Sequence, residues 1–202
     1  GCAFKGCTAL TSVTIPASVT GIGDNTFEGC TALTDVNLAA GSKLETIGEK
    51  AFYGSGLTSI AIPASVQTIG TYAFDGCAAL KNVTFGANAQ LTTIGLAAFR
   101  GTGLTAIALP TTLAEDGLTL GSSLFQDCTS LASVKLGDSV TKIDASTFQG
   151  CTALTSITIP ASVTSIGKLA FSGSGLTSVK IPATVVTTGD SWFQDCLALS
   201  VP

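Results

Sequence analysis

The sequence contains no histidine, and only 11% of its 202 residues are charged. Histidine is the commonest general base near neutral pH and the commonest protein ligand for metals, so its absence argues against both kinds of site. The charged share is about half the usual one. The nine Lys and Arg residues are scattered and the net charge is −4, so the sequence has no basic stripe that could bind a nucleic acid. We therefore expect no enzyme, no cofactor or metal, and no nucleic-acid partner.

Long uninterrupted hydrophobic runs are also missing. The longest apolar stretches, such as residues 60–64, are broken by Pro, Ser or Thr well before the roughly 20 residues that a bilayer requires. The overall hydrophobic share of 46% is nevertheless too high for a disordered chain and sufficient for a core. No export signal is visible at Gly1, but the chain begins within a motif, so this says little about its natural precursor. A folded domain without a transmembrane segment is expected.

The dominant positive feature is an internal repeat. Phenylalanine returns at intervals of 22–26 residues, and a leucine follows each one five or six residues later. The phenylalanines at this repeat position are Phe4, Phe27, Phe52, Phe74, Phe99, Phe125, Phe148, Phe171 and Phe193. Such regularity is typical of a solenoid, in which stacked units bury a shared core. It predicts a single domain over residues 1–202, made of about nine repeats and truncated within a repeat at both ends.

Each unit can be interpreted from its best-preserved copy. Leu154, Ile157 and Ile159 form an L-x-x-L-x-L segment whose last two apolar residues alternate with polar ones, as in a half-buried strand. Pro160 follows, which suits the end of a strand because proline lacks an N–H group. A second, shorter extended segment ends at Gly167, where a sharp turn is expected. The Ala-Phe-x-Gly stretch that follows is predicted to form one helical or 3-10 turn and to place its phenylalanine in the core.

Three units carry insertions, all between the first strand and the Ile-Gly turn. They lie at residues 39–43, 86–90 and 111–117. Insertions on one edge of a solenoid mark loops that often lie near a binding face. Surface loops also accept extra residues at small entropic cost, so tolerated drift is the alternative.

The pattern L-T-S-I-T-I-P-x-S-V-T-S-I-G-x-x-A-F-x-G-C resembles the BspA-type (Treponema pallidum-type) leucine-rich repeat, from Phe4 to Leu199. The resemblance implies a right-handed leucine-rich-repeat solenoid of the kind found in bacterial surface and secreted proteins and in many protist proteins. Members with assigned roles are mostly adhesins or ligand binders, and the family has no shared catalytic residues. The chain departs from the pattern at Asp144, which replaces the turn glycine, and at Thr188, which replaces the turn isoleucine.

Six of the seven cysteines share one repeat position. They are Cys7, Cys30, Cys77, Cys128, Cys151 and Cys196, and the same position holds Ser55, Thr102 and Ser174 elsewhere. Cysteines in consecutive repeats could approach disulfide distance. A position that accepts Cys, Ser or Thr, however, favours any small side chain, which a free buried thiol satisfies. We expect structural free thiols; no C-x-x-C pair or histidine supports a metal site. Cys2 lies outside this column.

The expected concave face offers the better candidate for binding, through the outward residues of the first strands. This surface is polar and nearly without aromatics, and it lacks the Trp, Tyr and Arg that dominate binding hot spots. Weak multivalent contact or glycan binding fits it better than a high-affinity protein site, and a merely solvated Ser/Thr sheet is the alternative. Together with the insertions and the only tryptophan, it supplies these candidate binding residues: Asp35, Asn37, Lys43, Asn82, Gln90, Glu115, Asp116, Lys135, Lys180 and Trp192.

Two of these features have specific alternatives. Glu115 and Asp116 are too few to hold calcium, which gathers six to eight oxygens, and are expected to form an exposed turn. Trp192 either covers an open end of the core or anchors a contact with another molecule.

These observations predict a non-catalytic binding or adhesion module, secreted or at the cell surface, that meets a protein or glycan partner. The alternative is a structural subunit docked in a larger assembly, because the chain begins and ends within a repeat.

Overall fold

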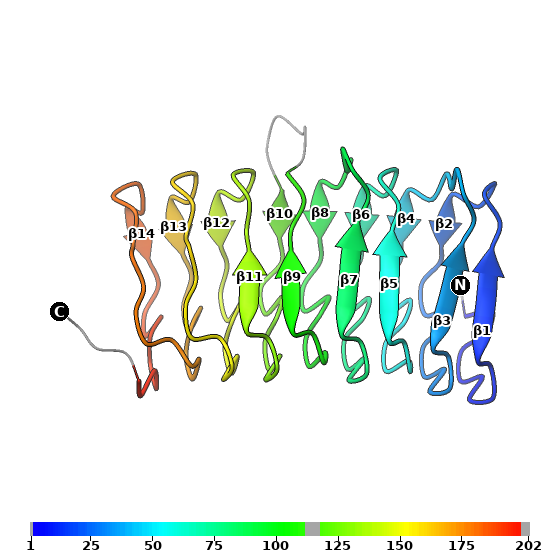
Figure 1. The fold of residues 1–202 in the computed structure, drawn as a ribbon, viewed down its shortest axis with the longest axis horizontal. Helices are drawn as coiled ribbons and strands as arrows, with labels where there is room; N and C mark the ends of the chain where they lie inside the picture. Colours follow the sequence, from blue (N-terminus) through cyan, green and yellow to red (C-terminus); the bar gives the residue numbers. More distant parts are fainter. Residues whose placement is uncertain (1, 112–117, 199–202) are drawn as a thin grey trace.

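The computed structural model describes residues 2–111 and 118–198. The chain forms one elongated coil with two rows of parallel strands (Figure 1). In each unit it rises along a first strand at the front, crosses at the top, and returns behind through a short second strand before advancing to the next unit.

The first-strand row begins as the repeat predicts. Its strands are β1 (Ser12–Ile15), β3 (Asp35–Leu38), β5 (Ser59–Ile62), β7 (Asn82–Phe85), β9 (Ala106–Ala108) and β11 (Ser133–Lys135). They pair two by two, as β1–β3, β5–β7 and β9–β11, with equivalent repeat positions opposite one another. Beyond β11 the row continues as a single bridge between Thr158 and Lys180, so the best-preserved copy lacks a full strand.

The second-strand row is made of two-residue strands. They are β2 (Gly21–Ile22), β4 (Thr46–Ile47), β6 (Thr68–Ile69), β8 (Thr93–Ile94), β10 (Thr119–Leu120), β12 (Lys142–Ile143), β13 (Ser165–Ile166) and β14 (Thr187–Thr188). β2 to β10 form a five-stranded sheet and β12 to β14 a three-stranded one. In β2 to β13 the second residue is a buried isoleucine or leucine, but Thr188 in β14 is exposed.

The phenylalanines form a continuous stack along the core, as the repeat predicts. Ring centroids of successive phenylalanines lie 5.2–5.9 Å apart, from Phe4 to Phe193. The seven rings between these two are buried. Each ring thus fills the space between two neighbours, and no unit closes its core alone.

The helical or 3-10 turn expected around each phenylalanine is not confirmed. Among the described residues these segments are non-helical turns. The N–H of Phe52 bonds to the carbonyl oxygen of Ala73 in the next unit, at 2.8 Å. On either side of the phenylalanine, Lys50 and Gly54 adopt positive φ. The backbone of the turn therefore forms hydrogen bonds with the next coil, and its positive φ angles are incompatible with a right-handed helix.

The cysteines of the column carry free thiols, which are buried as expected at Cys30, Cys77, Cys128 and Cys151 but exposed at Cys7 and half-buried at Cys196. Cys77 Sγ donates to the carbonyl oxygen of Phe52 at 3.0 Å. In the same way, Cys128 donates to the carbonyl oxygen of Phe99 and Cys151 to that of Phe125, both at 3.1 Å. Ser55 lies in the same column, with its hydroxyl 3.3 Å from Cys77 Sγ. The column thus favours a small side chain with a hydrogen to donate, which explains the exchange of Cys for Ser or Thr.

Candidate functional site

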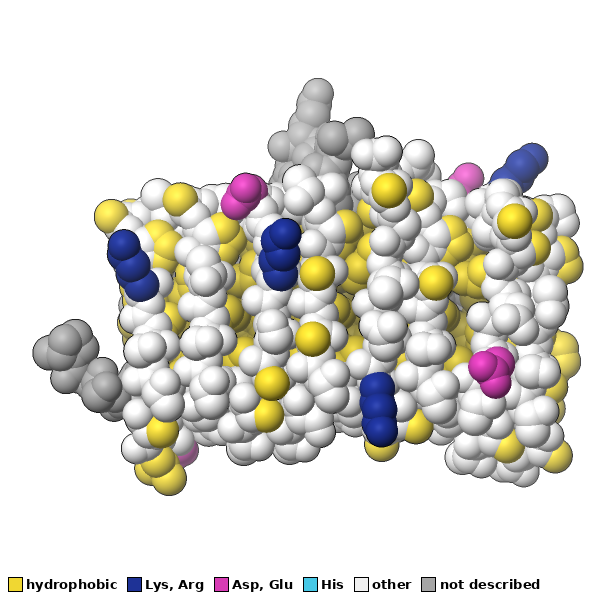
Figure 2. All heavy atoms as spheres, viewed as in Figure 1, with side chains coloured by type: hydrophobic (Ala, Val, Ile, Leu, Met, Phe, Trp, Pro, Cys, Tyr) yellow, Lys and Arg dark blue, Asp and Glu magenta, His cyan; other side chains and the backbone are white. Residues whose placement is uncertain are grey.

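The first-strand face is broad, polar and sparsely charged, as expected (Figure 2). Along β1, β3, β5 and β7 the first and third residues are exposed, while the residues between them are buried or half-buried. This alternation follows from the pleat of a strand that packs on the core with one side only. Asp35, Asn37, Asn82 and Lys135 all lie on the exposed side, where the sequence places them.

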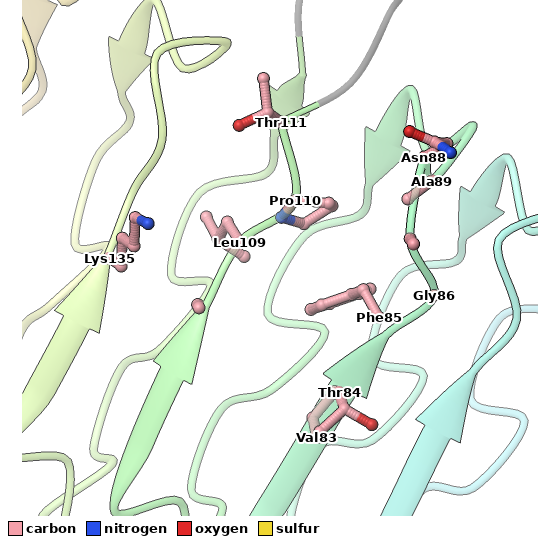
Figure 3. A pocket seen from close by; sticks show the side chains of 12 residues that line it. Val83, Thr84, Phe85, Gly86, Asn88, Ala89, Leu109, Pro110, Thr111 and Lys135 are labelled. Atoms are coloured by element: carbon pink, nitrogen blue, oxygen red, sulfur yellow. The ribbon is translucent and has the colours of Figure 1, made fainter.

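The strand ladder of this face is interrupted twice, because neither β3 and β5 nor β7 and β9 pair. A hollow of about 550 Å³ lies where β7 and β9 end. Phe85, Leu109 and Pro110 supply its apolar surface, and Thr84, Asn88 and Thr111 supply polar groups around it (Figure 3). We call it the β7–β9 hollow.

An inserted turn and a proline border this hollow. In the turn, which follows Phe85, Asn88 adopts a positive φ of 57°. Pro110 has no N–H to donate to a neighbouring strand. Phe85 is left half-buried instead of being covered. Lys135 from β11 stands at the side of the hollow as its one cation among the lining residues.

A second hollow on the same face repeats this chemistry. It measures about 620 Å³ and lies between the units of Ile159 and Lys180. Ile157 and Ile159 line it together with Pro182, and Lys180 is again the one cation among the lining residues. We call it the Lys180 hollow. Two places on one face therefore combine aliphatic surface, a proline and a single lysine.

The remaining sequence candidates do not join these hollows. Lys43 and Gln90 are exposed on two of the inserted loops. The ring of Trp192 stacks on that of Phe193 at 4.4 Å. Glu115 and Asp116 lie outside the described residues. Within the described ranges, no hydrogen bond or ion pair joins two of the predicted side chains.

Sequence reasoning missed one group of residues. Tyr53, Tyr72 and Arg100 fall in three consecutive Phe turns and surround a hollow of about 390 Å³ away from the first-strand positions. They include both tyrosines and the only arginine of the chain. Their repeat positions, one residue after or two before the phenylalanine, were the available signal.

Within residues 2–111 and 118–198, no group of three or more His, Cys, Asp or Glu residues could hold a metal ion. No helix in this part of the chain is long and apolar enough to cross a membrane.

Solved structures with similar folds come from bacteria. The pneumococcal vaccine antigen PcpA superimposes with a TM-score of 0.73 at 28% identity, over 95% of this chain and 50% of that one. A T. pallidum leucine-rich-repeat protein superimposes with a TM-score of 0.72 at 28% identity, over 94% of this chain and 82% of that one. A leucine-rich cell surface protein of Faecalibacterium prausnitzii superimposes with a TM-score of 0.59 at 30% identity, over 98% of this chain and 60% of that one. The chain thus spans only about half of the pneumococcal antigen.

The comparison with curated proteins finds no match. The family model of the BspA type leucine-rich repeat region matches residues 2–117 and 91–200, so it covers nearly the whole sequence. The stacked Phe turns, the two strand rows and this match agree. The chain belongs to the BspA-type leucine-rich-repeat family.

Proposed function

We propose that this chain is a non-catalytic recognition or adhesion module that presents its first-strand face to a protein or glycan partner. The observation that carries the proposal is the pair of hollows on this face, the β7–β9 hollow and the Lys180 hollow. Binding sites on proteins are concave, largely apolar, and oriented by a few polar groups. Both hollows combine apolar side chains with a few polar groups, whereas the rest of the face is mostly polar.

The comparison with solved structures supports a surface role. The similar structures include a vaccine antigen and a cell surface protein, and we infer the same setting, outside the cell or on its surface, for this chain.

We also infer that the coil is right-handed, as the family resemblance implies. The path of the chain in Figure 1, which rises in front and returns behind while advancing to the left, supports this handedness.

The proposal can be tested with arrays of purified extracellular proteins and of glycans, probed with the labelled chain. Ala108 is exposed and lines the β7–β9 hollow, so Ala108→Arg fills the hollow without disturbing the core. Ala61 occupies the same repeat position in β5, exposed and outside both hollows, so Ala61→Arg is the matched control.

We expect at least one array partner whose binding falls about tenfold or more in Ala108→Arg and is unchanged in Ala61→Arg. Equal binding by the two variants would remove the β7–β9 hollow from the proposal. No binding on either array, with light scattering showing a stable oligomer, would favour a structural subunit instead. Antibody labelling of intact, non-permeabilised cells tests the location; labelling only after permeabilisation would contradict it.

A further inference from the structure

A different surface, formed by the Phe turns, carries another hollow. The Phe turns of four consecutive units, those of Phe27, Phe52, Phe74 and Phe99, bring six side chains around one hollow of about 390 Å³. The residues are Glu28, Lys50, Tyr53, Tyr72, Asp75 and Arg100. We call it the tyrosine hollow. In a repeat whose surface is mostly Ser and Thr, this is where the chain gathers the residue types that are enriched in binding hot spots.

The side chains of the tyrosine hollow are held in place by one another. Arg100 binds Asp75 through two parallel hydrogen bonds, from Nε to Oδ1 at 3.1 Å and from Nη2 to Oδ2 at 2.6 Å. Asp75 is only 4% exposed, so this fork is largely shielded from water. The hydrogen bonds that Arg100 donates to Asp75 raise the pKa of Arg100 above its already high value. A guanidinium fixed in this way loses little freedom when a ligand arrives.

Tyr72 is fixed by cations from both neighbouring units. The Lys50 ammonium, from the unit before, lies 5.7 Å from the centre of its ring, and the Arg100 guanidinium, from the unit after, lies 5.5 Å from it. Both distances fall in the range of cation–π attraction. Tyr53, in contrast, is 38% exposed and presents its ring to solvent. The site thus has a rigid side and an open aromatic side.

The charges around the tyrosine hollow cancel. Arg100 is paired with Asp75, Glu28 with Lys5 at 2.9 Å, and Lys50 lies 3.7 Å from Glu49. An anionic ligand would need uncompensated positive charge, and a purely apolar ligand would strip water from these ions without replacing it. A ligand with many hydroxyl groups matches the site, because each hydroxyl can donate to a carboxylate and accept from an ammonium or guanidinium.

We propose that the tyrosine hollow binds one unit of a neutral saccharide, with the C–H face of the sugar on the ring of Tyr53. The sugar hydroxyls then meet Glu28, Lys50 and the Asp75–Arg100 pair at the rim. The volume suits one sugar ring rather than a folded partner, and affinity for a single unit is weak because so small a contact leaves little surplus over the cost of binding. A polymer bound by many copies of the chain gains affinity through multivalency. This inference rests on the proposed function only in treating the chain as a binding module; it uses a separate surface.

Saturation-transfer NMR on the intact chain tests the proposal. The probes are the methyl glycosides of glucose, galactose, mannose and N-acetylglucosamine, with glucuronic acid and a hexaglutamate peptide as anionic comparisons. Tyr53→Ala removes the exposed ring, and Tyr53→Phe keeps the ring but removes its hydroxyl. Gln149→Ala is the matched control, because Gln149 occupies the same repeat position outside the hollow. Unfolding midpoints of the variants verify that each one folds.

We expect transfer to ring protons of at least one neutral glycoside, an affinity at least tenfold lower in Tyr53→Ala, and a smaller loss in Tyr53→Phe. Gln149→Ala and a rise in salt from 50 to 500 mM leave the signal unchanged, because the ligand is neutral. Absence of transfer from every neutral glycoside, equal signals in wild type and Tyr53→Ala, or tighter and salt-sensitive binding of the anionic probes overturns the inference. Ala108→Arg separates the two proposals: it removes the array partner of the first-strand face and leaves glycoside binding intact.

Discussion

At the scale of single residues, the stacked phenylalanines stabilise the core of this solenoid. Phe148 stacks between Phe125 at 5.7 Å and Phe171 at 5.4 Å and is fully buried. Its ring therefore contributes contacts to two units at once. Ser156, only eight residues further along the chain, lies on the exposed side of the first-strand row and is not part of this core.

Phe148→Ala is expected to lower the free energy of unfolding by about 3–5 kcal/mol, because it leaves a cavity between two coils. Ser156→Ala is expected to be close to neutral. Urea unfolding followed by circular dichroism measures both. Equal effects of the two substitutions would show that the assignment of core and surface positions is wrong.

Buried thiols give the chain a second residue-scale property. Burial raises the pKa of Cys77 and of Cys128 to about 11 and also raises that of Cys151. An unfolded thiol titrates near pH 8.5, so the folded state holds more protons between about pH 9 and 11. For Cys77 and Cys128, the stabilisation from the neutral thiol is complete below pH 8 and is lost as the pH rises through 11.

We expect the free energy of unfolding to fall above pH 9, by at most about 1.4 kcal/mol per pH unit for each buried thiol. Urea unfolding between pH 8 and 11 measures the slope. A triple variant with serine at Cys77, Cys128 and Cys151 is the control, because serine occurs naturally in this column at Ser55. A slope unaffected by the three serines would mean that other groups cause it.

At the scale of elements, the turn glycines set how closely coils can stack. An added Cβ at Gly167, which follows β13, would lie 2.5 Å from the backbone nitrogen of Ala145 in the preceding unit. Gly21, within β2, has only the carbonyl oxygen of Thr46 near its added Cβ, at 3.9 Å. Glycine is therefore required at residue 167 because the backbones of two neighbouring coils approach closely there, and not only because the chain turns.

Gly167→Ala is expected to destabilise the fold by about 1–3 kcal/mol, because backbone atoms must move apart to admit the methyl group. Gly21→Ala serves as the control and is expected to be neutral or slightly stabilising, because it restricts the unfolded chain without a clash. Thermal unfolding of both variants checks this. Indistinguishable midpoints would refute the close approach at Gly167.

The whole molecule behaves as a one-dimensional array. Phe stacking and the hydrogen bonds of the turns join each unit to its neighbours, as with Phe52 and Ala73 or Phe148 and Ala170. Stability is then a sum of unit terms and nearest-neighbour terms. A change in one coil is felt in the next one and fades beyond it.

Pairs of Phe→Leu substitutions measure this range. Phe74 and Phe99 stack at 5.2 Å, so their two substitutions are expected to couple by about 0.5 kcal/mol or more. Phe27 and Phe171 lie at opposite parts of the stack, and their effects are expected to add within about 0.5 kcal/mol. Double-mutant cycles in urea provide both values. Strong coupling of the distant pair would contradict the nearest-neighbour description.

The sequence alone determined the repeat, the core positions and the register. Val13 and Val36 occupy the same repeat position and lie opposite each other in paired strands, as alignment of the repeats requires. This was predictable because a solenoid is built by stacking like on like, so periodicity along the chain becomes adjacency in space. The same reasoning identified the exposed side of Lys135 and the Cys, Ser and Thr column.

Only the tertiary structure decided how coils meet, and both candidate sites depend on that. The Phe turn is not helical, because the N–H of Phe52 bonds to the next coil rather than to its own. The β7–β9 hollow lies between two adjacent strands that do not pair, and the tyrosine hollow lies where Asp75 and Arg100, 25 residues apart, meet across a unit boundary. A pattern within one unit specifies what that unit buries. The offset between stacked units determines which surface side chains touch.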